Sequence, residues 1–487
     1  MFSAKREGLR RIQLGPFVVL GGRMSSPNLG HLMSALLTSS PASLSWSERP
    51  GRALLRLAWP ITVSMVSFSA MTLASTAFVA HVGADELAGV GLAGVVGFAL
   101  VCFGIGLLRG AKTLVSQAVG ANRTDRIPEL LGAAVAIAVV LGFLALASGQ
   151  LLAPLLEALT ASPRAGHFAA EYLSIRSLGA PLVLVYAALR EARYGVGDSR
   201  TPMRASLAGN AVNIALDVVL ILGLEWGVRG AAYATIAGNI TEVAILAWPM
   251  RGQLAKLRWS RAAAGEVWAQ GVPNGLQFIM EVGSFLILTV LVARMSAIDA
   301  AAHQMVLHLV NVSFLPAHAL AEAAAVLVGQ AVGAGKDGLV PRVARRALAI
   351  GAGYATVCLV GYAVLGHVIA TAMAAGDTAL AERATLLVYV SLAFLVADAA
   401  NVIARGVLRG ASDVRYAAVV GIATSWLTTP PLTWLLGMHL GLGVIGGWIG
   451  LAVEIVAGAA LFWLRVWRGG WKPAAAAARR SMAGTAV

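Results

Sequence analysis

Apolar segments long enough to cross a lipid bilayer recur along most of this chain, and they constrain its fold more than any other feature. A membrane-spanning helix needs about 20 apolar residues, and short connections join the segments here. Only 12% of the 487 residues are charged, about half the fraction that is usual in soluble domains. The sequence therefore predicts an all-α integral membrane protein with twelve transmembrane helices, near residues 57–80, 88–108, 130–154, 170–189, 205–225, 229–249, 268–293, 302–328, 347–370, 384–404, 416–437 and 443–464.

The basic residues are distributed unequally between the two sides of the predicted membrane. If the N-terminus is cytoplasmic, 32 of the 37 lysines and arginines belong to cytoplasmic segments and five to external ones. Because short cytoplasmic loops are enriched in Lys and Arg, we expect a multi-pass protein of the bacterial inner or plasma membrane with both termini cytoplasmic. The net charge of +14 is then spread over membrane loops, which argues against nucleic acid as a partner.

An internal repeat divides the apolar region into two halves. Residues 113–123 (TLVSQAVGANR) and 326–336 (VLVGQAVGAGK) match at seven of eleven positions, at an offset of 213. Six spans per half give both halves the same orientation, related by a pseudo-two-fold axis along the membrane normal. We expect a polar, disordered cytoplasmic tail at 1–53 (with Met24 or Met33 as alternative starts), six-helix lobes at 54–250 and 266–468, a cytoplasmic loop at 251–265, and a cytoplasmic tail at 469–487.

Carboxylates in the middle of apolar spans are the first candidates for a functional site. Charged groups within a membrane are costly and usually functional, and a buried carboxylate can hold a proton or supply oxygen ligands to a hard cation. Asp398 lies in the tenth span, and Glu281 lies two turns after Pro273 in the seventh. Packing against a neighbouring helix is the alternative role for Asp398.

Two further groups of polar residues lie in the spans. Asn213 and Asp217 are four residues apart, so they share one face of the fifth span. A local hydrogen bond between them is the alternative to a role in transport. Secondary candidates are Glu242 and Glu454, which are duplicated at an offset of 212, together with Gln304 and His303. Glu322 is expected to pair with a loop arginine.

Several segments resemble one known family in the same order along the chain. LAWPITVSMVSFSAMTLAS (57–75), TLVSQAVGA (113–121), GDSRTPM (197–203), GVPNGLQFIMEVGSF (271–285) and VADAANVIARGVLRGASDVR (396–415) are similar to segments of the multidrug and toxic compound extrusion (MATE) transporters. The resemblance covers roughly residues 54–468. It implies export of cationic or amphipathic compounds in exchange for inward Na⁺ or H⁺.

The resemblance also implies roles for individual residues. Asp398 and Glu281 match the tenth-helix aspartate and seventh-helix glutamate of one bacterial branch, and Asn213 with Asp217 matches the polar pair of the N-terminal lobe in another branch. Two positions depart from the family pattern. Ser75 replaces a common first-helix aspartate, and Phe394 replaces a tyrosine one turn before Asp398.

The expected mechanism is alternating access by a monomer, with no cofactor beyond the coupling ion and no metal site beyond Na⁺ at these acids. The ion would bind Glu281 and Asp398, or Asp217 with Asn213. One alternative is a flippase for lipid-linked saccharides, which would need a basic cleft, whereas the predicted spans contain almost no Lys or Arg. A polytopic membrane enzyme would need clustered catalytic residues near one face, and a passive channel usually needs an oligomer.

Overall fold

The first half of the apolar region forms six membrane-length helical segments. The computed structural model describes residues 44–160 and 162–484, which belong to one unit, Pro41–Val487. Most of the predicted tail at 1–53 lies outside the described residues. The six segments are α2 (Pro50–Val82), α3 (Ala84–Gly120), α4 (Ile127–Leu159), α5 (Pro163–Ser177) with α6 (Ala180–Gly195), α7 (Arg200–Asp217) with the π-helix η2 (Val218–Gly223), and α8 (Gly227–Ala247).

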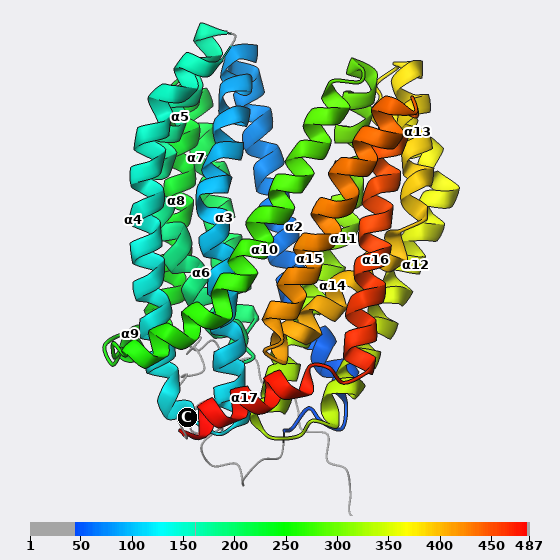
Figure 1. Ribbon diagram of the computed structural model, residues 1–487. Helices are drawn as coiled ribbons and strands as arrows, with labels where there is room; N and C mark the ends of the chain where they lie inside the picture. The colour runs from blue at the N-terminus through cyan, green and yellow to red at the C-terminus, as the bar shows by residue number, and fades with distance from the viewer. Residues whose placement is uncertain (1–43, 161, 485–487) are drawn as a thin grey trace, which may run out of the picture. The chain divides into compact units, whose positions relative to one another are not determined.

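The second half repeats this arrangement. A short 3₁₀ turn, η1 (Thr124–Arg126), precedes α4, and η3 (Trp248–Met250) with α9 (Arg251–Leu254) joins the halves. The helices that follow are α10 (Arg261–Ala293), α11 (Ala297–Gly333), α12 (Leu339–Met373), α13 (Thr378–Leu392) with α14 (Leu395–Gly410), α15 (Val414–Leu432) with the π-helix η4 (Thr433–His439), α16 (Val444–Trp467) and α17 (Lys472–Ala483). Figure 1 shows the two sets side by side.

The predicted spans correspond to these helices one by one. Nine helices in the described residues are individually long and apolar enough to cross a membrane, and two bent pairs, α5–α6 and α13–α14, form a span each. The bends measure 48° and 52°. Because α15 with η4 occupies the remaining predicted span at 416–437, the prediction of an all-α fold with twelve spans is confirmed.

The irregular features of the helices repeat as well. Both bent spans resume after their break 215 residues apart, at Ala180 and Leu395, and both π-helices begin 215 residues apart, at Val218 and Thr433. A repeat of helix breaks at nearly the offset of the sequence repeat shows that the duplication extends to the backbone. The two six-helix halves are therefore related by a pseudo-two-fold axis.

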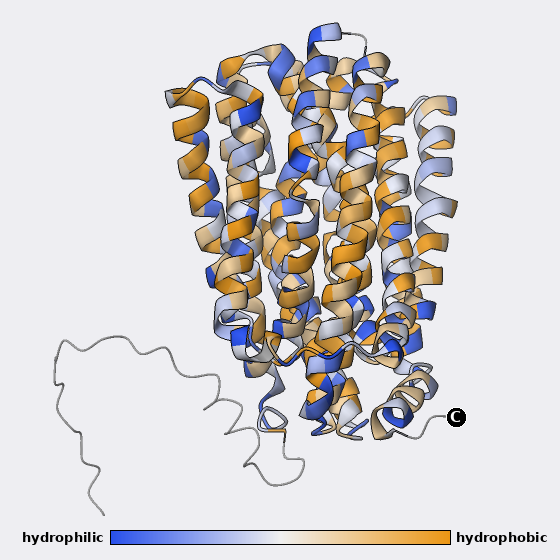
Figure 2. Cartoon of the chain, turned by 90° about the vertical axis from the view of Figure 1, so that its left-hand side faces the viewer, coloured by the Kyte–Doolittle hydropathy of each residue, from blue (hydrophilic) through white to orange (hydrophobic). Residues whose placement is uncertain are grey.

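The buried and the outward-facing positions of the helices differ in residue size. Large apolar side chains such as Leu151, Val364 and Leu427 are at least 70% exposed, as expected for groups in contact with lipid. The buried positions are rich in alanine and glycine instead, and Figure 2 shows apolar residues along the outward faces of the helices. Small residues allow close helix approach where no hydrophobic effect drives helices together.

Glycines set the closest contacts between the halves. A Cβ on Gly110 would lie 2.9 Å from the Cα of Gly271, and one on Gly106 would lie 2.8 Å from the Cα of Gly275, so α3 and α10 pack backbone against backbone. Gly333 packs equally closely on the backbone of Gln117. We call these contacts of α3 with α10 and α11 the seam. They involve the C-terminal part of α3, the end that leads into η1.

Helix α17 connects the two halves at the same end. Its N-cap residue Trp471 and its buried Ala475 pack in the apolar core of the second half, whereas Met482 packs in that of the first half. The Arg123 guanidinium donates a hydrogen bond to the Met482 carbonyl oxygen at 2.9 Å. The segment expected only as a cytoplasmic tail thus includes a helix that is anchored in both halves (Figure 1).

Several helices extend further than the sequence predicts, α3, α6 and α14 among them. The predicted spans end at residues 108, 189 and 404, whereas α3, α6 and α14 continue to Gly120, Gly195 and Gly410. Backbone hydrogen bonds and packing between the halves continue these helices past the apolar stretch. The additional turns carry the basic residues Arg109, Lys112, Arg190, Arg193, Arg405 and Arg409, so these helices contain basic residues that the predicted spans do not.

Candidate functional site

The polar pair of the first half lies in a buried cluster with two hydroxyl groups. Asp217 is fully buried near the end of α7, and the Ser75 hydroxyl of α2 donates a hydrogen bond to its Oδ2 atom. With the Asn213 amide oriented to satisfy both of its ends, its nitrogen donates to Asp217 at 3.2 Å and its oxygen accepts from the Thr235 backbone N–H at 3.0 Å. Asp217 Oδ1 has no hydrogen-bond partner in the described part of the chain.

In this arrangement Asn213 and Asp217 contact each other, as their spacing in the fifth span predicts. Ser75, which replaces the usual aspartate, contributes a hydroxyl to the Asp217 carboxylate. A dry carboxylate with one unpaired oxygen and several neighbouring oxygens can take up a proton or a hard cation. We call Ser75, Asn213, Asp217 and Thr235 the first-half cluster.

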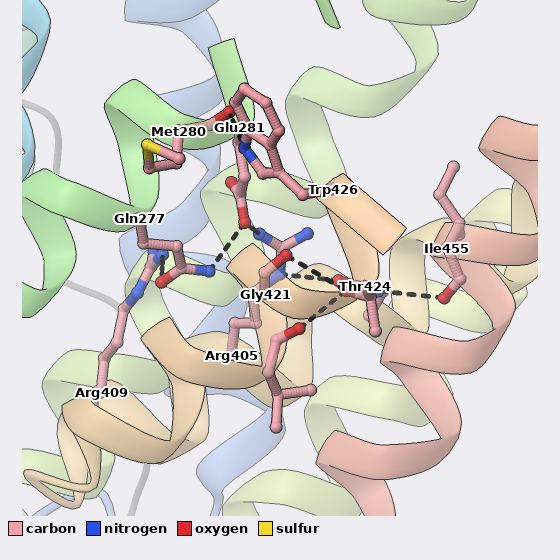
Figure 3. Close-up of polar contacts among 11 residues, drawn as sticks. Gln277, Met280, Glu281, Arg405, Arg409, Gly421, Thr424, Trp426 and Ile455 are labelled. Atoms are coloured by element: carbon pink, nitrogen blue, oxygen red, sulfur yellow. Dashed lines mark hydrogen bonds and ion pairs between the residues drawn. The ribbon is translucent and has the colours of Figure 1, made fainter. Parts of the chain in front are cut away.

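Glu281 in the second half is held by a half-buried ion pair. Arg405 Nη1 of α14 lies 2.7 Å from Glu281 Oε1, and the Gln277 amide donates to the same oxygen at 2.8 Å. Arg405 Nε donates to Asn401 Oδ1 at 2.7 Å, and Gln277 Oε1 accepts from Arg409 Nη2 at 3.1 Å. Figure 3 shows Gln277 bridging Glu281 and Arg409 across α10 and α14.

Asp398 lies elsewhere in the second half. It lines a small cavity with Ser313, Tyr354 and Cys358. No hydrogen bond or ion pair of its carboxylate joins it to another described residue, Glu281 included. Phe394, at the start of α14, is buried against Trp448, with ring centroids 6.1 Å apart, and supplies no oxygen. The structure therefore places Glu281 and Asp398 in separate surroundings.

The secondary candidates occupy four different environments. Glu454 accepts a hydrogen bond from the Thr429 hydroxyl, and Glu242 lies against Gly209 on α7. The indole of Trp448 donates to His303 Nδ1 at 3.1 Å, which fixes that ring inside the second half. Gln304 is exposed.

A layer of buried and half-buried charges lies where the halves meet, and Glu281 is its only member among the predicted site residues. Lys112 of α3 forms ion pairs with Glu191 of α6, at 3.4 Å, and with Glu322 of α11. Arg190 Nη2 lies 3.0 Å from Glu191 Oε1. The expected partner of Glu322 was a loop arginine, but the partner is a helical lysine from the other half. The charged layer comprises Arg109, Lys112, Arg190, Glu191, Glu281, Glu322, Arg405 and Arg409.

The charged layer could have been found from helical spacing. Arg109 and Lys112 are three residues apart, and Arg405 and Arg409 are four apart, so each pair shares one helix face. Arg190 and Arg405 also correspond to each other at an offset of 215, close to that of the sequence repeat. The hydropathy pattern obscured this signal, because a span that ends at its last apolar residue assigns these residues to loops.

Twelve spans in two repeated halves, with ionisable side chains buried within and between them, define a membrane transporter and not a membrane enzyme. The chain belongs to the MatE family, whose profile matches residues 60–219 and 273–435. These two matched segments begin 213 residues apart, the offset of the internal repeat.

Relatives of known name cover most of the chain. It is 31% identical to a probable multidrug resistance protein NorM from Bradyrhizobium diazoefficiens over 84% of this chain and 92% of the relative. A protein of the same name from Pseudomonas putida is 30% identical over 84% and 92%.

Solved structures share the fold at lower sequence identity. A MOP superfamily transporter from Pyrococcus furiosus aligns with a TM-score of 0.82 at 19% identity, over 90% of this chain and 99% of that one. An outward-facing multidrug resistance MATE family transporter aligns with a TM-score of 0.78 at 20% identity, over the same shares of the two chains.

Proposed function

We propose that this protein is a secondary active efflux transporter that exchanges drug-sized amphipathic compounds, including cationic ones, for inward Na⁺ or H⁺. Its relatives are named multidrug resistance proteins. The observation that carries the proposal is Asp217, a fully buried carboxylate with one unpaired oxygen inside the first-half cluster. Such a group within a membrane is costly unless an ion or proton uses it.

Alternating access is supported by where the halves touch. The seam, the Lys112–Glu322 ion pair and α17 all join the halves at the end that carries both the η1 turn and α17. Six of the 32 basic residues assigned to the cytoplasmic side lie in the extended ends of α3, α6 and α14. The other 26 still outnumber the five basic residues of the opposite side. The same orientation follows, with both termini cytoplasmic in a bacterial inner membrane and the cytoplasmic end closed. One chain supplies both halves, so we propose that it acts as a monomer.

Ion and substrate would be coupled through their preference for different openings. A ligand shifts a conformational equilibrium only by its differential affinity for the two states. Asp217 binds its ion between α2 and α7 of one half, so occupancy changes the packing of α2, whose N-terminal part contacts the second half through Leu54 and Ile61. Through this contact, ion binding in the first half would affect how the second half packs against it.

The experiment is dye transport in proteoliposomes with sodium and proton gradients imposed separately. We expect one gradient to drive a cationic dye in the wild type and Asp217→Asn to reduce the rate at least tenfold, because amide for carboxylate removes the ionisable group. Asp125→Asn is the matched control, since that carboxylate is 63% exposed in the η1 turn. Undiminished transport by Asp217→Asn would contradict the assignment of the coupling site.

The second-half acids are tested in the same assay. Asp398→Asn removes a carboxylate that has no hydrogen bond or ion pair within residues 44–160 and 162–484, and Glu281→Gln removes the partner of Arg405. Loss of transport in either variant would add that acid to the coupling machinery. Full activity in both would restrict ion binding to the first half.

A further inference from the structure

An open pocket of about 480 Å³ lies where the start of α2 meets the start of α12. Glu48 and Pro50 line it on one side. Arg342, Arg345 and Arg346 line it on the other side, and all three are exposed. No hydrogen bond or ion pair joins these guanidinium groups to another residue within the described ranges. We call this site the arginine pocket, and one carboxylate against three cations leaves it positive.

Packing beneath the pocket fixes the positions of its two walls. Leu54 of α2 lies in one buried apolar cluster with Val343 and Ala347 of α12. A Cβ on Gly51 would lie 3.9 Å from Ile350 Cδ1, so the two helices are in contact at this level. Since α2 belongs to the first half and α12 to the second, a ligand in the pocket contacts both halves at once.

The start of α2 provides a second attraction for an anion. The helix begins at Pro50, and no described side chain caps the amide groups of its first turn. Uncapped N–H groups and the dipole at a helix N-terminus favour phosphate and other anions. Arg49, Arg52 and Arg56 are also exposed at the start of this helix. A phosphate in the pocket therefore meets guanidinium groups and a helix N-terminus together.

The outward face of α12 continues from the pocket as an apolar stripe. Arg342 and Arg346 are one turn apart. Val357, Val360 and Val364 follow at helical spacing on the same face, and they are 71%, 53% and 71% exposed. The eleven residues from Arg346 to Val357 span about 16 Å of helix, close to half of the hydrocarbon thickness of about 30 Å. A molecule with a phosphate head and an acyl chain fits both parts.

We propose that the arginine pocket binds the phosphate of an anionic phospholipid whose acyl chains lie along α12. The pocket is at the end of the molecule that carries α17, because Arg479 of α17 pairs with Asp337 just before α12 (Figure 1). In the proposed orientation this end faces the cytoplasm, where anionic lipids attract basic segments next to the membrane. A free phosphate could make the same contacts with the arginines, but it would leave the apolar stripe unused.

The bound lipid has a structural consequence. Its headgroup contacts the start of α2 and the start of α12, so it stabilises the packing of the first helix of one half on the other half. This site is separate from the first-half cluster. The inference therefore rests on the proposed orientation and goes beyond the proposed efflux function, and binding can be measured without transport.

The test measures lipid binding by the full-length protein in detergent. Phosphatidylglycerol with a fluorescent label on one acyl chain is titrated with protein, and its fluorescence anisotropy gives the Kd. The triple variant Arg342→Gln, Arg345→Gln and Arg346→Gln should raise this Kd roughly tenfold or more, because the cations that face the headgroup are lost. The triple variant Arg342→Lys, Arg345→Lys and Arg346→Lys should stay within about fivefold of the wild type, since ammonium groups also attract phosphate.

A matched control separates the pocket from net charge. Lys256→Gln, Arg258→Gln and Arg261→Gln together remove the same number of exposed cations near the connection between the halves. Because these cations lie outside the pocket, the Kd of this variant should stay within about twofold of the wild type. Equal losses of binding in this variant and in the glutamine variant of the pocket, or no loss in either, would overturn the pocket.

Competition with unlabelled compounds identifies the source of the phosphate. Unlabelled phosphatidylglycerol should displace the labelled lipid, whereas phosphatidylcholine with the same acyl chains should not. Glycerol 3-phosphate and inorganic phosphate at millimolar concentration should also leave the labelled lipid bound. Displacement by either soluble phosphate would overturn the assignment to a lipid, and displacement by phosphatidylcholine would overturn the role of the headgroup charge.

Discussion

Lys112 is the residue on which the charged layer depends most. Its ammonium group pairs with Glu191 of its own half and Glu322 of the other, and all three side chains are less than 10% exposed. Burying three charges is favourable only when each is compensated. Lys112 therefore fixes two carboxylates and links α3 to α11.

Replacing Lys112 by Met should strongly destabilise the protein. Removing one partner of a buried ion pair typically costs about 3–5 kcal/mol, because the remaining charge is left without compensation. The measurement is the free energy of unfolding in detergent, with Lys256→Met, at an exposed position, as the control. Adding Glu322→Gln to Lys112→Met should recover part of the loss. An unfolding free energy equal to that of the wild type would refute the structural role of Lys112.

At the scale of elements, α3 and α10 share the most extensive contact between the halves. Their approach depends on glycines spaced four residues apart on both helices, Gly106 with Gly110 and Gly271 with Gly275. Residues at this spacing lie on one helix face. Along this part of the seam, α3 and α10 therefore approach until backbone meets backbone.

Gly271→Ala should weaken this contact. The added Cβ would lie 2.3 Å from the Leu107 carbonyl oxygen, so the helices must move apart. Overpacking of this kind costs about 1–3 kcal/mol, and thermal unfolding in detergent measures it. Gly265→Ala on the same helix is the control, because its Cβ would meet no atom within 4 Å. Equal melting temperatures for the two variants would show that the seam is not tight.

At the scale of the whole molecule, α17 is the connection most open to a direct test. Met482→Asp would introduce a charge at a position that is 2% exposed within the core of the first half. Because an unpaired buried charge is unfavourable, the end of α17 should detach and expose Arg479 and Arg480 to trypsin. Ala483→Asp, at the adjacent exposed position, should leave cleavage unchanged. Equal cleavage of both variants would contradict the anchoring of α17.

The fold was predictable because its signals are local. Twenty-residue apolar segments and the Gln117 and Gln330 motifs can be recognised within a few turns of helix. The pairing of Asn213 with Asp217 was predictable for the same reason. The partners of Lys112 and Glu281 were not, since these contacts join helices up to 210 residues apart. The hydropathy pattern also placed the ends of α3, α6 and α14 too early. These helices continue beyond their apolar stretches because they pack against the other half.

Helix α17 has a consequence for the evolutionary symmetry of the molecule. A duplicated gene begins as two identical halves, each able in principle to replace the other. Here only the second copy is followed by a segment that reaches back to the first, from Trp471 to Met482. A tandem of two first halves would keep all twelve spans and lose this link. The halves have therefore ceased to be interchangeable.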